Sequence, residues 1–205
     1  MEKTELVLLA GEGALEFALK EGFPEDHCIS EEQSEAWQRG KDSLARGQVP
    51  LQNLFTGLEY GGDTVGCVLW DGDNLGAAST TGGVSLKTPG RVGDTPCFGG
   101  GIFASRTSAV VCTGVGEAFV ETLTAKYVDE RITGGAHPQQ AVEEALQRLE
   151  ELKGAQGGIL AVDFGGRTGA AFNAGRFPVV IVNDGKIKEN FIPVNLRPGL
   201  KGNKT

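Results

Sequence analysis

The stretch GGDTVG, from Gly61 to Gly66, constrains the fold of this chain more than any other. Thr64 follows two glycines and an aspartate and opens the apolar run Val65–Trp70, which is typical of a buried β-strand. The glycines allow backbone angles that other residues avoid, so a sharp turn can precede this strand. Taken alone, Thr64 is an ordinary β-forming residue at a strand end. If the chain is cut before it, however, the freed α-amine, with a pKa of roughly 7.7–8.0, can act as base for its hydroxyl.

Glycine shapes the rest of the chain in the same way. The 32 glycines among 205 residues gather at the ends of expected strands, in 61–66, 82–101, 113–116 and 154–169. This distribution predicts a sheet protein whose backbone approaches a ligand closely. The length of 205 residues suits one medium domain, and the 40% of residues that are apolar suit a sizeable core.

Charge and composition argue against several classes of function. A formal net charge of −8 argues against a nucleic-acid-binding protein and against adhesion to anionic membranes. Only His27 and His137 are present and the cysteines form no cluster, so we expect no metal site. The pattern GEG at 11–13 lacks the third glycine of a dinucleotide-binding fingerprint, and we expect no cofactor.

The cysteines and the N-terminus indicate the compartment. The four cysteines are irregularly spaced, and Cys67 and Cys112 lie inside apolar runs, which predicts buried thiols in a reducing compartment rather than disulfides. The apolar run Leu6–Ala10 is too short for a signal peptide or a membrane span. We therefore expect a cytoplasmic protein.

Apolar periodicity predicts an α+β fold. Helices are expected at 14–20, 31–46, 114–132 and 138–153, with Ser30 capping the second and Gly154 closing the last. Strands are expected at 5–10, 64–70, 75–80, 108–113, 157–164, 168–173 and 177–182. Residues 47–62 are expected to form a mobile loop. Because strands precede and follow a helical block, an antiparallel sheet covered by helices is favoured over a doubly wound parallel sheet.

A threonine nucleophile needs partners, and the sequence offers candidates. The hairpin predicted at 64–81 makes Thr81 a neighbour of Thr64. Thr113 and Gly114 end a strand before a helix, where a hydroxyl and a backbone N–H can stabilise an oxyanion. Arg91 can bind a substrate carboxylate through two hydrogen bonds, and Asp94 can bind an ammonium group.

Each candidate also has a purely structural interpretation. Arg91 and Asp94, three residues apart in a glycine-rich loop, can pair with each other simply to order that loop. Thr113 can be a cap for the helix that follows it. Thr81 can be an ordinary strand residue. The residues taken singly leave these alternatives open.

The motifs taken together resemble one family. GDTVG, STTGG, KTPGRVGDTPCFGGG and VVCTGVGEAF are closely similar to the β-subunit of the isoaspartyl peptidase/L-asparaginase family, N-terminal-nucleophile hydrolases related to glycosylasparaginase. The resemblance runs from about Leu6 to Lys186. It implies an αββα sandwich, made as one precursor that cuts itself at the Asp63–Thr64 bond. The aspartate before the threonine looks like glycosylasparaginase, and CTGVGEAF looks more like the isoaspartyl peptidases.

The resemblance also implies a role for each candidate. Thr64 matches the nucleophile, and Thr81 the threonine that supports it. Thr113 and Gly114 match the oxyanion hole. The substrate-binding residues that it implies are Arg91, Asp94 and Gly116. It implies hydrolysis of β-aspartyl amides, namely L-asparagine and isoaspartyl dipeptides, and a homodimer of processed heterodimers.

The chain also departs from the family pattern. Family members begin with a glycine-rich turn, helices, strands and a metal-binding loop, and we expect this region to be missing before Met1. Residues 1–63 then correspond to a remnant of the α-subunit, with a linker at 47–62, and 64–205 to the β-subunit. The sandwich is expected to lack its N-terminal part. The alternative functions are a non-catalytic or unprocessed relative and hydrolysis of the sugar–asparagine bond.

Overall fold

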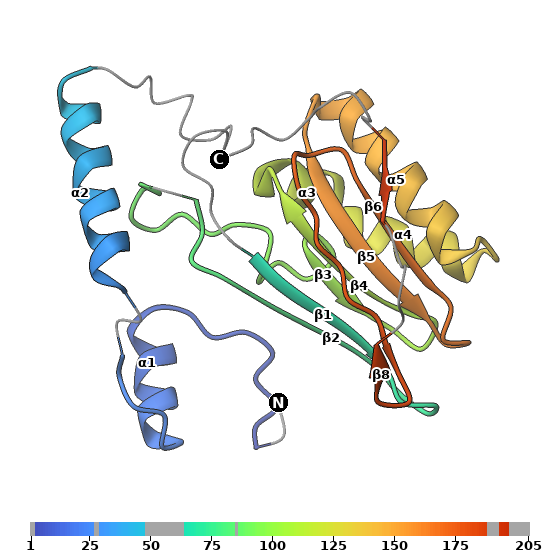
Figure 1. Ribbon diagram of the computed structural model, residues 1–205. Helices are drawn as coiled ribbons and strands as arrows, with labels where there is room; N and C mark the ends of the chain where they lie inside the picture. The colour runs from blue at the N-terminus through green and yellow to red at the C-terminus, as the bar shows by residue number, and fades with distance from the viewer. Residues whose placement is uncertain (1–2, 27–28, 48–63, 85, 188–192, 197–205) are drawn as a thin grey trace.

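The computed structural model describes residues 3–26, 29–47, 64–84, 86–187 and 193–196 (Figure 1). Its helices are α1 (Gly11–Lys20), α2 (Glu31–Ala45), α3 (Gly116–Thr122), α4 (Thr124–Thr133) and α5 (Pro138–Lys153). Its strands are β1 (Thr64–Trp70), β2 (Leu75–Thr81), β3 (Ile102–Ala104), β4 (Ser108–Gly114), β5 (Gly157–Asp163), β6 (Thr168–Phe172), β7 (Val182–Asn183), β8 (Lys186–Ile187) and β9 (Val194–Asn195). Asp63 and the linker predicted at 47–62, except Gly47, lie outside the described residues.

The strands and helices form layers, as an α+β chain should. A five-stranded sheet has the order β3-β4-β5-β6-β9 and is antiparallel except for the β6–β9 pair. Helices α4 and α5 cover one face of it, and the β1–β2 hairpin lies across the other (Figure 1). The core on the helix side consists mainly of Val110, Cys112, Phe119, Val128, Val142, Leu146, Leu149, Ile159 and Ala161.

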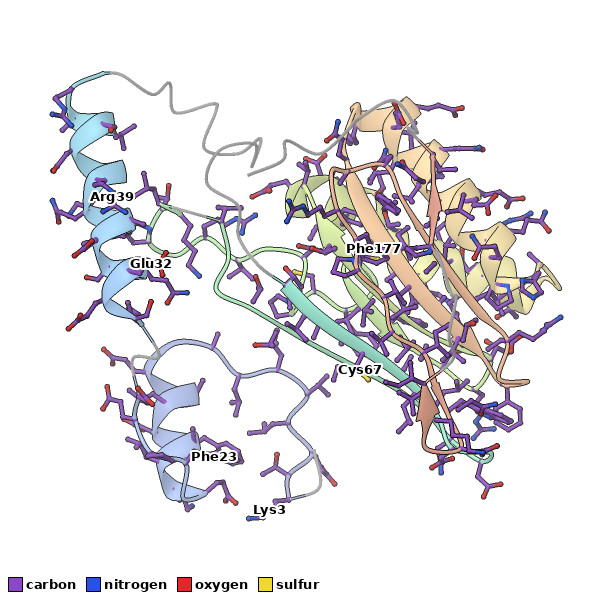
Figure 2. All side chains as sticks on the ribbon, in the orientation of Figure 1. Lys3, Phe23, Glu32, Arg39, Cys67 and Phe177 are labelled. Carbon is purple, nitrogen blue, oxygen red and sulfur yellow. The ribbon has the colours of Figure 1, made fainter. Side chains whose placement is uncertain are left out.

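The outer face of the hairpin is not covered by the described residues. Side chains alternate along a strand, so Val65, Cys67 and Leu69 share the face turned away from the sheet. Val65 and Leu69 are 68% and 58% exposed. The prediction of a buried thiol is therefore confirmed for Cys112 but wrong for Cys67, which is exposed (Figure 2).

The hairpin is held in register by its own turn. The Asp71 carboxylate accepts hydrogen bonds from the backbone N–H groups of Asp73 and Asn74, at 2.9 and 2.7 Å. An aspartate that closes a turn in this way fixes which residues face each other along the two strands. In the resulting register Thr64 lies opposite Thr81.

Two predicted strands are not formed. Residues 5–10 are exposed, have no regular secondary structure and pair with no strand in the described chain. Figure 2 shows Lys3 and Phe23 in this N-terminal part, apart from the sheets. The strand expected at 177–182 is reduced to β7, which pairs with β8 apart from the five-stranded sheet, and Phe177 packs over Gly158. An apolar pattern alone does not provide the neighbouring strand that a sheet requires.

The helix expected at 114–132 is divided in two. Leu123 adopts a left-handed conformation with φ of 48°, between α3 and α4. The N–H groups of Ala125 and Lys126 donate to the carbonyls of Gly100 and Gly99 in the preceding loop. The loop thus satisfies the first amides of α4, which a continuous helix would have bonded internally.

The expected ends of helices α2 and α5 are confirmed. Ser30 forms a capping box with Gln33 at the start of α2. Pro138 occupies the first turn of α5, and Gly154 ends it with a φ of 61°. In the described part of the chain, no helix has the length and apolar character needed to cross a membrane.

Candidate active site

The hydroxyls of Thr64 and Thr81 lie together at the start of the hairpin. Thr64 Oγ1 donates to Thr81 Oγ1 over 3.2 Å, and Thr81 Oγ1 also accepts from the backbone N–H of Gly83 at 3.0 Å. The turn at Asp71 sets the register and so places the two side chains opposite each other. Thr64 is only partly buried, so its hydroxyl can meet a ligand.

Two contacts show which end of the five-stranded sheet Thr64 faces. A Cβ placed on Gly66 would lie 2.9 Å from Val111 in β4, and one on Gly166, in the turn after β5, would lie 2.6 Å from the Trp70 ring. The turn after β5 is next to the start of β4, because Asp163 pairs with Ser108. The chain in β1 therefore runs opposite to β4, and Thr64 lies over the end where β4 finishes.

Thr113 and Gly114 occupy that end of β4. Val111 and Thr113 share the face covered by the hairpin, because side chains alternate along the strand. Thr113 does not cap α3, since its N-cap residue is Val115 and no side chain caps it. Gly114 has a φ of 143°, and a Cβ there would lie 2.6 Å from Gly157 Cα. Only glycine lets the chain turn from β4 into α3 at this point.

Arg91 is paired with Glu117 and not with Asp94. Its Nε and Nη2 donate to Glu117 Oε1 and Oε2 at 2.9 and 3.0 Å, a two-pronged arrangement that joins the loop to the first turn of α3. These hydrogen bonds raise the pKa of Arg91 and lower the pKa of Glu117. Among the described residues no hydrogen bond or ion pair joins Arg91 to Asp94, so their mutual pairing does not order the loop.

Asp94 is a buried carboxylate with an unsatisfied oxygen. The residue is 7% exposed, and Oδ2 has no hydrogen-bond partner among the described residues. Burial raises the pKa of Asp94, while backbone amides and the charge of Arg91 offset part of that rise. A buried acceptor without a donor is rare and costly, roughly 1–3 kcal/mol. The arrangement is therefore suited to a ligand that brings a cationic donor.

Three glycines make room for these two charged groups. A Cβ on Gly93 would lie 2.9 Å from Arg91 Nη1. One on Gly116 would lie 2.7 Å from Asp94 Oδ1 and 3.1 Å from Arg91 Nη2. One on Gly101 would lie 2.7 Å from Asp94 Oδ2. Arg91 and Asp94 thus lie directly against the backbone, which explains the glycines at these three positions.

Arg91 and Asp94 lie at the same end of β4 as the threonines. The charge of Asp94 reaches Cys112, where burial first and Asp94 second raise the pKa of the thiol. Cys112 directly precedes Thr113, and Gly116 follows two residues after Gly114. The structure therefore gathers Thr64, Thr81, Thr113, Gly114, Arg91, Asp94 and Gly116 around the end of β4.

Sequence reasoning missed two residues at this end. Glu117 holds Arg91, and the Phe177 ring covers Gly158, which pairs with Thr113. Phe177 also lies 6.0 Å from the Phe172 ring, between centroids. Glu117 could have been noticed as the one acidic side chain beside the CTGVG turn. No sequence signal places Phe177, which reaches the site from a segment expected to be a strand.

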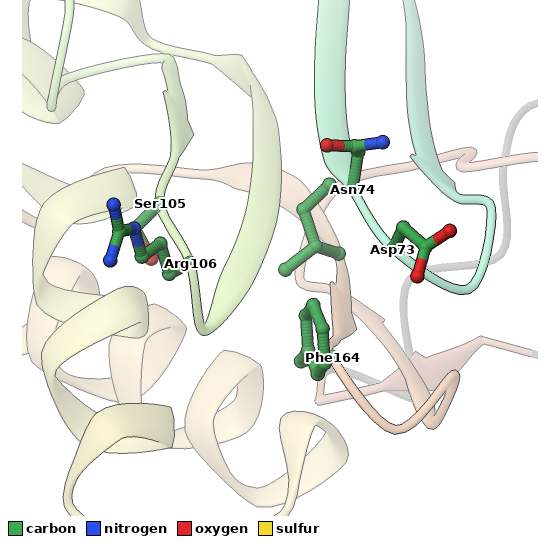
Figure 3. A pocket seen from close by; sticks show the side chains of 6 residues that line it. Asp73, Asn74, Ser105, Arg106 and Phe164 are labelled. Carbon is green, nitrogen blue, oxygen red and sulfur yellow. The ribbon is translucent and has the colours of Figure 1, made fainter.

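A hollow lies at the opposite end of the hairpin. It is lined by Asp73, Asn74, Leu75, Ser105, Arg106 and Phe164, where the hairpin turn meets the turns after β3 and β5 (Figure 3). None of the predicted site residues lines it. Thr64 is at the other end of β1, so this hollow is separate from the gathered threonines.

Comparison with known proteins gives consistent matches over most of the chain. A family model described as Asparaginase matches residues 1–192. The plant-type L-asparaginase of Pyrococcus horikoshii is 38% identical over 191 residues, or 90% of this chain and 63% of the relative. The N(4)-(β-N-acetylglucosaminyl)-L-asparaginase of Elizabethkingia miricola is 37% identical, covering 83% of this chain and 51% of the relative. The isoaspartyl peptidase of Escherichia coli is 37% identical, covering 84% and 56%. The chain therefore spans less than two thirds of the length of these relatives.

Proposed function

This chain belongs to the asparaginase family, and we propose that it hydrolyses β-aspartyl amide bonds, in L-asparagine and isoaspartyl dipeptides, with Thr64 as nucleophile. The observation that carries the proposal is the buried, unpartnered Oδ2 of Asp94 beside Arg91. A substrate with an α-ammonium and an α-carboxylate satisfies both groups, and its side-chain amide then extends from this anchor toward the threonines.

Activation is proposed to occur by cleavage of the Asp63–Thr64 bond. It would divide the chain into residues 1–63 and 64–205 and free the α-amine of Thr64. That amine, with an unperturbed pKa of roughly 7.7–8.0, is then the base for the Thr64 hydroxyl. In the uncleaved chain the Thr64 hydroxyl donates its proton to Thr81, which holds the side chain in place. Once the amine is free, we propose that it replaces Thr81 as the acceptor of this proton.

The proposed reaction has two steps. Thr64 Oγ1 attacks the side-chain amide carbon while its proton passes to the freed amine. Thr113 and the backbone N–H of Gly114 stabilise the oxyanion, and Gly116 contacts the substrate through its backbone. Ammonia, or the amine of a dipeptide, takes the proton and leaves a β-aspartyl ester on Thr64. Water then hydrolyses the ester and restores the hydroxyl.

The fold and assembly of the active form are part of the same proposal. The helix layer and the two strand layers of the described residues support an αββα sandwich of the N-terminal-nucleophile type. We expect a homodimer of processed heterodimers in the cytoplasm. Sedimentation of the purified protein tests the dimer.

A second candidate is hydrolysis of the bond between a sugar and asparagine. The aspartate at position 63 and the similarity to the Elizabethkingia miricola enzyme favour it. The two candidates share the Thr64 chemistry and differ in the leaving group. Parallel assays with L-asparagine, an isoaspartyl dipeptide and a glycosylated asparagine distinguish them.

Intact mass and ammonia release test the proposal together. We expect two pieces divided after Asp63, and release of ammonia from L-asparagine. Thr64→Ala should abolish both, whereas Thr80→Ala, on the outer face of β2, should abolish neither. A chain that stays whole and releases no ammonia would instead be the non-catalytic relative.

A further inference from the structure

Glu117 leaves one side of Arg91 free. The Nε and Nη2 atoms of Arg91 are bonded to Glu117, while Nη1 lies over Gly93 and donates no hydrogen bond to a described residue. The Arg91 side chain is 14% exposed and that of Glu117 is 47% exposed. Glu117, the more exposed partner, thus binds the mostly buried guanidinium of Arg91 on the side that faces solvent.

The held position keeps Arg91 away from Asp94. Both groups approach Gly116, with Arg91 Nη2 3.1 Å and Asp94 Oδ1 2.7 Å from the position that a Cβ would take there. Opposite charges this close in a partly buried site attract strongly. Yet Asp94 Oδ2 remains without a partner among the described residues. Glu117 is the carboxylate to which the guanidinium is bonded instead, and it therefore competes with Asp94 for Arg91.

We propose that Glu117 is a positioning residue that holds Arg91 apart from Asp94, so that both groups stay available to the substrate. The inference rests on the proposed function, in which Arg91 and Asp94 bind the substrate's carboxylate and ammonium. Without Glu117, Arg91 turns to Asp94 and the resulting ion pair must be broken by each incoming substrate. Glu117 touches neither the substrate nor the reacting atoms.

The consequence is a change in binding and not in chemistry. Once substrate is bound, Thr64 and Thr81 are unaltered. Substitution of Glu117 should therefore raise KM for L-asparagine with little change in kcat. A residue that merely stabilised the fold would lower the active fraction, and hence kcat, and leave KM unchanged.

Binding of L-aspartate, measured by calorimetry, tests the inference without requiring turnover. We expect Glu117→Ala to weaken binding about tenfold, equivalent to about 1.4 kcal/mol. Glu117→Gln keeps one acceptor for Arg91 and should weaken binding less. Glu121→Ala is the matched control, because Glu121 lies in the same helix and pairs with Lys153, and it should bind as the wild type does.

A second measurement follows Arg91 itself. In the ¹⁵N NMR spectrum, the Arg91 Nε–H signal is identified by its loss in Arg91→Lys. It should exchange slowly with solvent in the wild type and in Glu121→Ala. In Glu117→Ala it should move but stay protected, because Arg91 now bonds to Asp94.

The inference would be overturned by L-aspartate binding to Glu117→Ala at wild-type affinity, or by equal weakening in Glu117→Ala and Glu121→Ala. Failure of the wild type to bind L-aspartate would overturn it as well. Ammonia release is judged separately. A wild type that binds L-aspartate in the expected order of variants but never hydrolyses asparagine defeats the proposed function and leaves the role of Glu117 standing.

Discussion

Two buried aspartates, Asp94 and Asp129, have opposite surroundings. Asp129 is 3% exposed and Asp94 7%. The Oδ1 of Asp129 accepts from the hydroxyls of Ser105, Thr107 and Ser108, and its Oδ2 accepts from Lys126 Nζ at 3.0 Å. The Oδ2 of Asp94 accepts from no described residue. Both aspartates are therefore almost inaccessible to solvent. Both oxygens of Asp129 accept hydrogen bonds, whereas Oδ2 of Asp94 accepts none from the described residues.

The pKa values change in opposite directions for this reason. Burial by itself raises the pKa of both carboxyl groups. At Asp129 the hydrogen bonds from Ser105, Lys126, Ser108 and Thr107 outweigh burial, and the pKa is lowered. At Asp94 burial prevails and the pKa is raised. Asp129 therefore joins the turn after β3 to α4, while Asp94 Oδ2 has no partner among the described residues.

Substitution of Asp94 should give the largest effect on activity. Asp94→Asn removes the charge that the proposed function assigns to the substrate ammonium, while the size of the side chain is kept. Loss of one partner of a buried charge pair costs about 2–5 kcal/mol. We expect kcat/KM for L-asparagine to fall at least about 100-fold, measured as ammonia release.

The same variant should keep or gain stability. The side-chain amide in Asp94→Asn is less costly to bury than the unpaired carboxylate of the wild type. The free energy of unfolding in urea should therefore rise by up to about 1 kcal/mol. A marked loss of stability would mean that Asp94 supports the fold, as Asp129 does, and would remove the contrast between them.

Substitution of Asp129 should show the reverse. Asp129→Ala leaves three hydroxyls and the Lys126 ammonium without their common acceptor. Ser108 is fully buried, and loss of its acceptor costs roughly 1–3 kcal/mol, while Ser105, Thr107 and Lys126 are only partly buried. We expect the free energy of unfolding to fall by about 3 kcal/mol, with KM unchanged in the folded fraction. A raised KM would show that Asp129 also acts on the site.

Sequence alone could predict the parts of the site that depend on local structure. The Thr64–Thr81 pairing follows from a hairpin whose turn, Asp71–Asn74, is set by its own side chain. The glycine clusters predict a backbone that approaches a ligand closely, and this stays a prediction. The structure shows Gly93, Gly101 and Gly116 close to Arg91 or Asp94. The helix cap at Ser30 was equally local.

The remainder depends on contacts between distant segments. Arg91 bonds to Glu117, which is 26 residues away, and not to Asp94, which is closer in the sequence. Only the turn from β4 into α3 brings Arg91 and Glu117 together. The Leu123 break depends on the carbonyls of Gly99 and Gly100, which no helical pattern contains. Residues 5–10 have the apolar pattern of a strand but no partner strand among the described residues.

An added methyl group at Gly116 should produce a smaller change than loss of Asp94. In Gly116→Ala the Cβ would lie 2.7 Å from Asp94 Oδ1 and 3.1 Å from Arg91 Nη2, so both groups must shift. We expect KM for L-asparagine to rise about tenfold, since small displacements of positioned groups reduce binding and rate. Gly165→Ala is the control, because its Cβ would meet only Asp163 Oδ1 at 3.4 Å. Equal effects of the two substitutions would contradict the role of Gly116.

The smallest expected effect is in the pH dependence of stability, which compares the two aspartates directly. A carboxyl group whose folded pKa lies below its ordinary value of 3.8 stabilises the fold above that pH, and its contribution is lost as the pH falls further. The contribution of Asp129 should thus be constant from pH 7 to about pH 4. A raised folded pKa has the opposite sign: ionised Asp94 destabilises the fold at neutral pH, and the penalty disappears as the pH falls through that raised value toward 3.8.

Urea unfolding of the wild type, Asp94→Asn and Asp129→Ala between pH 7 and about pH 4 distinguishes the contributions of the two aspartates to stability. The stability gap between wild type and Asp94→Asn should close by up to about 1 kcal/mol between pH 7 and about pH 4, because protonated Asp94 resembles the amide. The gap between wild type and Asp129→Ala should stay constant over the same interval and narrow only below it. A constant gap for Asp94→Asn would mean that this carboxylate is already satisfied at neutral pH. The proposed substrate ammonium would then have no unpartnered oxygen to bind.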